Sequence, residues 1–192
     1  GVKKMKNVLI CNQKGGVGKT LIADELAFGF ERDQISFSLY DLDQQGGLIH
    51  EARENDDAAV AIIDTPGALQ SDLKKWMDAA DIIIIPTMMS NRDVPPLELM
   101  IELTKEYQGK KPVLFVLNRW NHYNITKDFI EWFDEKYPEL QTAVLSDCTA
   151  FNQAGARGIS IKELSPRSSG AKQMSEIYGF VKTALKLKEG WR

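Results

Sequence analysis

Cysteine is scarce in this sequence, and no hydrophobic run is long. Only two of the 192 residues, Cys11 and Cys148, are cysteines, and their positions match no metal-binding spacing. The apolar stretch 82–85 ends at Pro86 after four residues, whereas a membrane span needs about 20 residues. Lys6 leads directly into the first apolar segment, so no secretory signal is expected. These absences predict a cytoplasmic protein in which Cys11 is a small core residue.

An excess of either charge is also missing. The formal net charge is −3 and the isoelectric point is about 5.5. These values argue against a uniformly basic nucleic-acid-binding protein but leave room for a local basic patch. Hydrophobic residues make up 43% and charged residues 27%, which is ordinary for a globular protein, so we expect no disorder. A chain of this length can bury a substantial core, and we expect a single domain over residues 1–192.

Short apolar runs alternate with longer amphipathic stretches along the chain. This alternation is typical of an α/β fold with a doubly wound, mostly parallel sheet flanked by helices. The polar segment 48–57 fits neither pattern, and His50 within it is expected to be solvated. The runs predict strands at about 7–12, 35–41, 59–64, 81–86, 112–118 and 141–146. The amphipathic stretches predict helices at about 19–32, 69–79, 94–108, 125–136 and 170–188.

A glycine-rich loop separates the first predicted strand from the first predicted helix. Glycines permit backbone conformations that turn several N–H groups toward one anion, and the helix adds the positive end of its dipole. Lys19 is then expected to reach the β- and γ-phosphates of a nucleotide, and the Thr20 hydroxyl to bind Mg²⁺. Strand, loop and helix in this order are the context of a phosphate-binding P-loop. The residues expected around the phosphates are Gly15, Gly16, Val17, Gly18, Lys19, Thr20 and Leu21.

The loop departs from the strict pattern G-x-x-x-x-G-K-[ST] because Gln13 occupies the first glycine position. A second lysine, Lys14, stands directly before the glycines. In both features the loop resembles the deviant Walker A box of the ParA/MinD ATPases. The resemblance implies an ATP- and Mg²⁺-dependent homodimer in which Lys14 reaches the phosphates held by the other subunit and neutralises charge there. Leu21 stands where the family often has threonine, so a hydroxyl contact to the α-phosphate is expected to be missing.

Acidic residues follow two of the predicted strands. Asp41 and Asp43 are two positions apart at the end of the second strand, so their side chains can face the same side. Asp64 ends the third strand, where open α/β sheets bind ligands, and this layout predicts that it holds Mg²⁺ through water. By resemblance to ParA proteins, Asp41 supports the metal, Asp43 orients the attacking water, and the turn 65–67 senses the γ-phosphate. The alternatives are a solvated acidic turn for the first pair and a helix-capping role for Asp64.

The resemblance is weaker after Asp64 but covers nearly the whole chain. Segment 85–93 is similar to the family pattern Pro-x-x-x-Ser-Pro-x-Asp, with Asn91 in place of the second proline. Asn118 ends the fifth predicted strand and resembles an asparagine that contacts adenine in MinD-like proteins, although an ordinary turn role is equally compatible with its position. Segment 149–163 resembles the part that closes over the base, with Cys148 in place of a common arginine.

Basic residues crowd the last 36 positions, where eight lysines and arginines outnumber three glutamates by five. Such a stripe suits salt-sensitive contacts with DNA phosphates, and it suits a solvated helix face equally well. The C-terminal helix is only weakly apolar, so a membrane anchor is disfavoured and no membrane partner is expected. The basic residues are Arg157, Lys162, Arg167, Lys172, Lys182, Lys186, Lys188 and Arg192.

The leading interpretation is a small ParA-like ATPase that dimerises on ATP and hydrolyses it slowly to drive plasmid or chromosome partition, stimulated by a ParB-like protein. Lys14, Lys19 and Asp43 are its expected catalytic residues. A MinD-like positioning or transfer-apparatus ATPase with protein cargo is an alternative that the sequence separates poorly from the first. A small-molecule phosphate-transferring enzyme is less favoured, because segment 48–57 leaves little room for substrate loops. The two cysteines give no support to an iron–sulfur relative.

Overall fold

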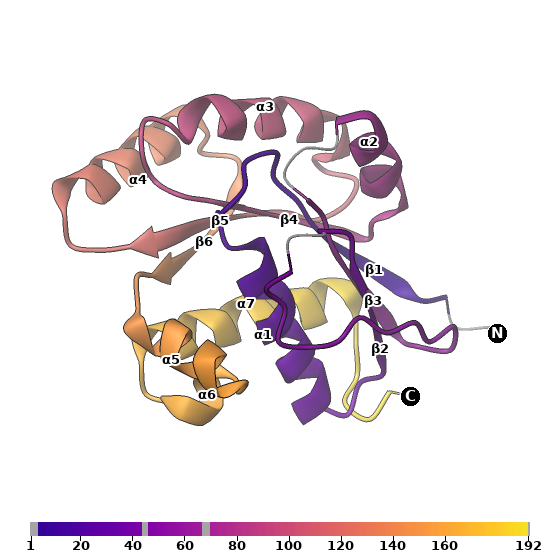
Figure 1. Ribbon diagram of the computed structural model, residues 1–192. Coiled ribbons are helices and arrows are strands. Elements are labelled where there is room, and N and C mark those ends of the chain that lie inside the picture. Colours follow the sequence, from indigo (N-terminus) through magenta and orange to yellow (C-terminus); the bar gives the residue numbers. More distant parts are fainter. Residues whose placement is uncertain (1–3, 44–45, 67–69, 192) are drawn as a thin grey trace.

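The computed structural model describes residues 4–43, 46–66 and 70–191, and its strands form one sheet (Figure 1). Neighbouring strands follow the order β2-β3-β1-β4-β5-β6, and each pairing is parallel. All the strands predicted from the sequence are present, with ends shifted by a few residues. They are β1 (Lys6–Ile10), β2 (Phe37–Asp41), β3 (Val60–Asp64), β4 (Ile82–Thr87), β5 (Val113–Trp120) and β6 (Gln141–Ser146).

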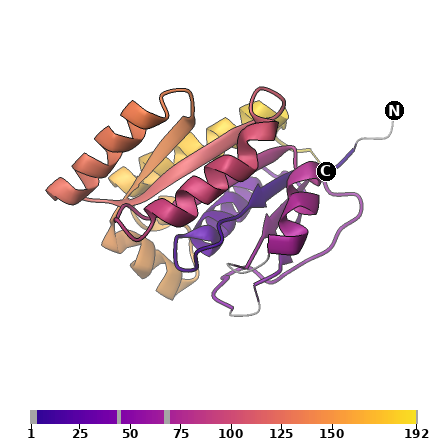
Figure 2. The same ribbon diagram turned by 90° about the horizontal axis from the view of Figure 1, so that it is seen from above.

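Helices cover both faces of the sheet. Helices α2, α3 and α4 lie on one face, where Figure 2 shows them side by side, and α1, α5, α6 and α7 lie on the other (Figure 1). This arrangement confirms the doubly wound α/β fold expected from the sequence. The helices are α1 (Lys19–Arg32), α2 (Gln70–Ala79), α3 (Val94–Thr104), α4 (Asn124–Lys136), α5 (Thr149–Arg157), α6 (Ile161–Leu164) and α7 (Ser169–Leu185), with a 3-10 turn η1 (Lys105–Tyr107) after α3.

The central strands are apolar throughout because helices cover both of their faces. Val8 and Ile10 of β1 pack into the core formed with α1 and α7, whereas Leu9 and Cys11 pack into the core formed with α2, α3 and α4. Cys11 is 1% exposed, which confirms the predicted core position. Burial raises the pKa of its thiol to about 12, so the cysteine stays protonated and inert at neutral pH.

Two short helices, α5 and α6, were not among the elements predicted from the sequence. They contain nine and four residues, too few for an apolar periodicity to stand out. Long-range contacts hold the start of α6. The buried Glu25 carboxylate of α1 accepts hydrogen bonds from the Ser160 hydroxyl (2.8 Å) and the Ile161 backbone N–H (2.9 Å). The helix expected over 94–108 also differs, because it changes to the 3-10 turn after Thr104.

The C-terminal segment folds back onto the sheet and α1. Helix α7 ends at Leu185, earlier than expected, where Lys186 adopts a left-handed conformation with φ of 54°. Leu187 then turns into the core, and the Trp191 carbonyl accepts a hydrogen bond from the Ser36 N–H (2.8 Å). Leu187 and Trp191 of this segment therefore pack against the core of the same chain. None of the helices in the described ranges is both long and apolar enough to cross a membrane.

His50 is not solvated, contrary to the expectation from the sequence. Its side chain is 11% exposed, and its two ring nitrogens contact the carboxylates of Asp24 and Glu31. Both carboxylates belong to α1, so the polar segment around His50 gave no local sign of the contact. Through these two contacts His50 connects the chain between β2 and β3 to α1.

The fold gathers the predicted site residues at one edge of the sheet. β1 lies between β3 and β4, and the connections on its two sides run over opposite faces. In open α/β sheets, ligands bind outside the carboxyl ends of the strands at such a switch point. Ile10 at the end of β1 is in register with Asp64, and Asp64 is in register with Asp41. The glycine-rich loop after β1 therefore lies next to both acids.

Candidate functional site

A cavity of about 430 Å³ opens at this edge of the sheet, next to the loop between β1 and α1. Its volume is within the range of small-ligand sites, which measure about 300–1,000 Å³. The glycine-rich loop forms one wall, and the carboxyl ends of β5 and β6 together with α5 form the other. The lining residues are Gly16, Gly18, Lys19, Thr20, Leu21, Asp43, Asn118, Arg119, Ser146, Asp147, Cys148, Phe151 and Asn152.

The remaining predicted site residues lie around this cavity and not in its lining. Lys14 and Gly15 border an adjacent hollow that also contains Asp93. Val17 is buried beneath the loop. Asp64 reaches the site through Thr20, whose hydroxyl donates to it (3.0 Å). The structure thus places the predicted residues in one region, in two connected groups.

The backbone of the loop is open toward an anion. Gly16 and Gly18 have φ values of +71° and +106°, in the left-handed region that glycine adopts without strain. Gly18 is the N-cap of α1, no side chain caps this end, and no acidic residue lies in the first turn. The first N–H groups of α1 are therefore available to phosphate oxygens, together with the positive end of the helix dipole.

Gly18→Ala is expected to weaken nucleotide binding about 5- to 150-fold, because the left-handed backbone that the phosphate-binding loop needs would be strained by about 1–3 kcal/mol. A Cβ at Gly18 would also lie 2.3 Å from Nδ2 of Asn118 and displace that side chain. Titration with a fluorescent ATP analogue measures the effect. Gly179→Ala on α7, where a Cβ meets nothing within 4 Å, is the matched control. Equal affinities for the two variants would contradict the strain argument.

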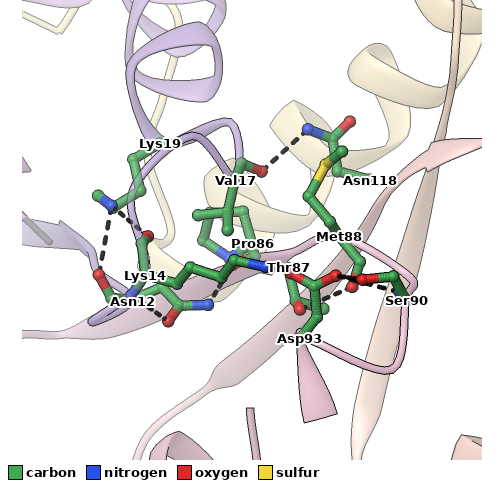
Figure 3. Close-up of polar contacts among 10 residues, drawn as sticks. All are labelled: Asn12, Lys14, Val17, Lys19, Pro86, Thr87, Met88, Ser90, Asp93 and Asn118. Atoms are coloured by element: carbon green, nitrogen blue, oxygen red, sulfur yellow. Dashed lines mark hydrogen bonds and ion pairs between the residues drawn. The ribbon is translucent and has the colours of Figure 1, made fainter. Parts of the chain in front are cut away.

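Lys19 is buried at the base of the loop. Its ammonium donates to the backbone carbonyls of Asn12 (3.2 Å) and Lys14 (3.0 Å) (Figure 3). Burial lowers the pKa of Lys19, and the carboxylates of Asp64 and Asp43 oppose this shift. The positive charge is therefore held within the loop and is compensated only by carbonyl dipoles and nearby acids. An anion in the loop would complete its charge balance.

Asn12 holds the start of the loop in place, a role that was not predicted from the sequence. Its Nδ2 donates to the Pro86 carbonyl on β4 (2.9 Å), and its Oδ1 accepts from the Lys14 N–H (3.0 Å). Figure 3 shows this side chain between the loop and β4. Asn12 thus fixes the start of the loop against the neighbouring strand. Its position at the end of an apolar strand, at the start of the loop that carries the glycines, was the available signal.

Lys14 forms an ion pair with Asp93, at the start of α3. The distance between Nζ and Oδ1 is 2.5 Å, and the two side chains are 36% and 2% exposed. Asp93 also accepts hydrogen bonds from the Ser90 N–H (3.1 Å) and the Ser90 hydroxyl (Figure 3). The similarity of segment 85–93 to a family pattern thus identified residues that meet the phosphate loop. The Lys14 ammonium faces its own chain in this structure.

Asp64 is the most strongly perturbed acid of the site. Its Oδ2 accepts from the Thr20 hydroxyl, while Oδ1 is buried without a hydrogen-bond partner among the described residues. Burial raises the pKa of Asp64 to about 6, the Thr20 hydrogen bond opposes the shift, and the neighbouring Asp41 charge adds to it. Asp41 in turn accepts a hydrogen bond from the Asp43 N–H (3.0 Å). The acids therefore form a connected cluster beside Thr20.

These residues fit a magnesium ion. A buried carboxylate oxygen that lacks a donor, next to a hydroxyl and a second carboxylate, offers the hard oxygen ligands that Mg²⁺ prefers. Within the described ranges, no three His, Cys, Asp or Glu residues are grouped closely enough to hold a metal by themselves. That result agrees with the chemistry of Mg²⁺, which keeps several waters and shares its coordination with phosphates. Thr20 and Asp64, supported by Asp41, are the residues that would hold it.

Asn118 lies on the opposite wall and braces the loop. Its Nδ2 donates to the Val17 carbonyl (2.9 Å; Figure 3). Its Oδ1 accepts from the Arg119 N–H (2.8 Å). Both polar atoms of the amide are therefore engaged within the chain. The adenine contact expected for Asn118 stays a prediction, and the structure adds a second role that the sequence did not reveal.

Two further expectations involve the chain that follows the acids. Thr65 is buried, and its hydroxyl donates to the Ile10 carbonyl (2.9 Å), so it links the end of β3 to β1. Gly67, the end of the expected γ-phosphate sensor, lies outside the described residues, as do Gln44 and Gln45 after Asp43. The expected roles of these residues stay predictions.

Comparisons with known proteins agree with this geometry. The structure is similar to that of an McdA variant from Cyanothece in complex with ATP (19% identity, TM-score 0.77, 98% of each chain covered). It is also similar to a plasmid partition protein from Borrelia burgdorferi bound to AMPPNP (16% identity, TM-score 0.70, covering 94% of this chain and 100% of that one). The septum site-determining protein MinD from Pyrococcus horikoshii with Mg-ADP shares the fold as well (14% identity, TM-score 0.67, covering 96% and 100%).

The sequence comparisons give a family but no individual relative. No curated protein sequence matches the chain at a significant level. The family model described as the CobQ/CobB/MinD/ParA nucleotide-binding domain matches residues 8–161. This range runs from β1 through the phosphate loop, the acids and Asn118 to the first residue of α6. The chain therefore belongs to the CobQ/CobB/MinD/ParA family of nucleotide-binding domains.

Proposed function

We propose that this protein is a ParA-like ATPase that binds Mg-ATP, dimerises on it and hydrolyses it slowly to drive DNA partition. The observation that carries the proposal is the second lysine of the loop. Lys14 lies outside the main nucleotide cavity and is held 2.5 Å from Asp93 of its own chain. A P-loop that acts within one subunit needs only Lys19 at the phosphates. Lys14 is a second cation beside the site, as an ATP-bridged dimer requires.

The other residues supply the remaining parts of the reaction. Lys19 and the N–H groups of the loop bind the phosphates, and Thr20 with Asp64 holds Mg²⁺, which neutralises charge on the phosphate oxygens. Asp43 lines the cavity and lies close enough to Lys19 to raise its pKa. A carboxylate there can accept a hydrogen bond from water and direct it at the γ-phosphate. The protein thus works mainly by positioning and charge stabilisation.

Dimerisation follows from a competition for Lys14. In the single subunit the ammonium pairs with the buried Asp93 carboxylate, which also accepts from Ser90. The phosphates of ATP in a second subunit carry more charge than one carboxylate, so they can draw Lys14 away. ADP lacks the γ-phosphate and competes less well. The subunits are therefore expected to associate with ATP and separate after hydrolysis, and a ParB-like protein would accelerate that step.

The structure alters the expected DNA-binding stripe in one respect. Lys182 is ion-paired with Asp33 (2.6 Å) and lies near Glu189 (3.6 Å), so it contributes to packing on α1. The other described basic residues are exposed and lie on α5, α6, α7 and the segments that follow them. They are Arg157, Lys162, Arg167, Lys172, Lys186 and Lys188. These six residues, with the expected contribution of Arg192, form the proposed DNA-binding surface.

DNA binding is expected with ATP and not with ADP or without nucleotide, because a dimer doubles the basic surface. The double variant Arg167→Glu/Lys172→Glu should weaken it roughly 100-fold or more and flatten its salt dependence, since each lost phosphate contact reduces the slope by about 0.9. Fluorescence anisotropy with a duplex of arbitrary sequence measures both. Lys75→Glu/Lys127→Glu changes two exposed lysines on the opposite face and is the matched control. Absence of DNA binding with ATP would favour the MinD-like alternative with protein cargo.

A further inference from the structure

Residues 46–50 of the connection between β2 and β3 lie against α1, and His50 contacts this helix through both ring nitrogens. Nδ1 of His50 is 2.8 Å from Oδ1 of Asp24, and Nε2 is 3.2 Å from Oε1 of Glu31. Asp24 and Glu31 are two turns apart on α1, so the imidazole bridges the helix along its length. None of the roles described above uses this histidine.

The carboxylate of Asp24 is a buried acceptor for this one segment. Asp24 is 4% exposed. It accepts hydrogen bonds from the Ile49 N–H (2.9 and 3.1 Å to its two oxygens) and the His50 N–H (3.1 Å), besides the imidazole contact. A buried carboxylate is costly unless it is paired in this way. Asp24 therefore stabilises one backbone conformation of segment 46–50, the one that directs the Ile49 and His50 N–H groups toward its carboxylate.

Apolar contacts fix the same path. The His50 ring lies edge-on to Phe28 of α1 with centroids 4.3 Å apart, and edge-on to Phe37 of β2 at 6.3 Å. The backbone at Gly47 is close enough to α1 that a Cβ there would lie 3.8 Å from Cγ2 of Thr20. The segment thus runs from the expected magnesium ligand Thr20 to the middle of α1. It also walls a second cavity of about 430 Å³ that shares Thr20, Leu21, Phe151 and Asn152 with the nucleotide cavity.

We propose that His50, together with Asp24, is a positioning residue for ATP hydrolysis. The pair fixes segment 46–50 on the helix that carries Lys19 and Thr20, beside the cavity that Asp43 lines. The inference rests on the proposed function, in which Asp43 orients the attacking water. The proposal predicts that hydrolysis and nucleotide binding respond differently to substitution of His50. Loss of the His50 contacts should impair hydrolysis while leaving nucleotide binding nearly intact, because the phosphate loop does not touch His50.

The attachment is strongest when the imidazole is protonated, because only then can both ring nitrogens donate. Burial alone lowers the pKa of His50, but the hydrogen bonds to Asp24 and Glu31 outweigh it, and the pKa is raised above its ordinary value of 6.5. The charged groups facing the ring are Asp24 and Glu31 of α1, and on the β2 side Arg53 covers Phe37 at 3.5 Å. Stability from the protonated ring is therefore fully present below pH 6.5 and is lost as pH rises through the raised value.

Three variants of the full chain test the inference. His50→Leu removes both donors at similar volume. His50→Asn keeps a donor near the Nδ1 position, toward Asp24, but cannot titrate. His122→Leu removes the other histidine, which is exposed, and is the matched control. The measurements are kcat from phosphate release, ATP affinity from a fluorescent analogue, and hydrogen exchange of the Ile49 and His50 amides in the wild type and of the equivalent amides in each variant.

In His50→Leu we expect faster exchange of these amides and a kcat lower by about 10- to 100-fold, the usual effect of a misplaced group. ATP affinity should change less than about twofold, because the contacts that hold ATP in its ground state are not altered. His50→Asn should recover most of the kcat. It should also lose the fall in kcat that the wild type and His122→Leu show as pH rises through the His50 pKa.

Several results would overturn the inference. Unchanged amide exchange in both His50 variants would show that the imidazole does not hold the segment. Faster exchange with an unchanged kcat would show a structural attachment without a role in hydrolysis. If His50→Leu does not fold, a His50→Asn variant with wild-type pH dependence would refute the proposal equally well. A wild-type protein without ATPase activity would refute the proposed function, while the exchange data would still decide whether His50 holds the segment.

Discussion

Lys19→Ala is expected to abolish nucleotide binding, whereas Asp43→Ala is expected to preserve binding and nearly abolish hydrolysis. The Lys19 ammonium is buried in the loop, bonded to two backbone carbonyls at 3.0 and 3.2 Å, where phosphate oxygens would meet it. It acts on the bound ground state. Charge-assisted contacts are worth about 1.5–3 kcal/mol each, so losing contacts with two phosphates should weaken binding roughly 100-fold or more.

Asp43 acts at a different stage. It lines the cavity, but a carboxylate repels phosphates in the ground state, so its removal should not weaken ATP binding. Its expected role is to hold the attacking water, and loss of such a group typically costs about 100- to 10,000-fold in rate. A mutation that lowers kcat without raising the dissociation constant is the signature of this role. Titration with a fluorescent ATP analogue and phosphate release separate the two effects.

Two control substitutions accompany Lys19→Ala and Asp43→Ala. Lys19→Met keeps much of the side-chain volume without the charge, and it should behave like Lys19→Ala if charge and not packing matters. Asp56→Ala removes an exposed carboxylate from the same connection between β2 and β3 and should hydrolyse ATP normally. Asp43→Ala with a wild-type rate would remove this residue from the reaction. Lys19→Ala with normal affinity would contradict the whole description of the loop.

Features that local sequence determines were predictable. Glycines at 15, 16 and 18 followed by Lys19 and Thr20 specify the loop, because glycine adopts without strain the left-handed conformations found at two of these positions. The strands were recognisable because a parallel sheet covered on both faces requires nearly continuous apolar runs. Asp64 could be placed for the same reason, since it ends such a run in register with Ile10 of β1.

Features that depend on distant partners were not predictable. Lys14 and Asp93 are 79 positions apart, and Asn118 and Val17 are 101 apart. The sequence placed Asn118 at the correct strand end but could not show that its amide is bonded to the loop. The start of α6 is held by Glu25 of α1, which accepts hydrogen bonds from Ser160 and Ile161 across 135 and 136 positions. His50 was misjudged for the same reason, since its environment is supplied by α1 and β2.

The second large effect is expected from substitution of Lys14. Lys14→Ala and Lys14→Gln are expected to bind ATP nearly as well as the wild type but to lose ATP-dependent dimerisation and, with it, DNA binding. The side chain is outside the main cavity and 36% exposed, so its removal leaves the phosphate cradle of its own subunit intact. Asp93 keeps its hydrogen bonds from Ser90, so the variants should fold.

The size of the effect follows from the exchange of partners that dimerisation requires. Lys14 gives up one carboxylate and gains the phosphates held by the second subunit. A charge-assisted contact is worth about 1.5–3 kcal/mol, and the lost contact with Asp93 is subtracted from it, so each site changes the dimer dissociation constant by at most roughly 10- to 100-fold. Because a symmetric dimer contains two such contacts, the variants should be monomeric at concentrations where the Asp43→Ala background is fully dimeric with ATP. Sedimentation of the variants in that background, with ATP or ADP, measures the loss of dimer.

The control is Lys110→Gln, which changes an exposed lysine just before β5 at the opposite edge of the sheet and should dimerise normally. A Lys14 variant that dimerises as tightly as this control would leave a P-loop ATPase that works within one subunit, and Lys14 would then serve only to hold Asp93 and the start of α3.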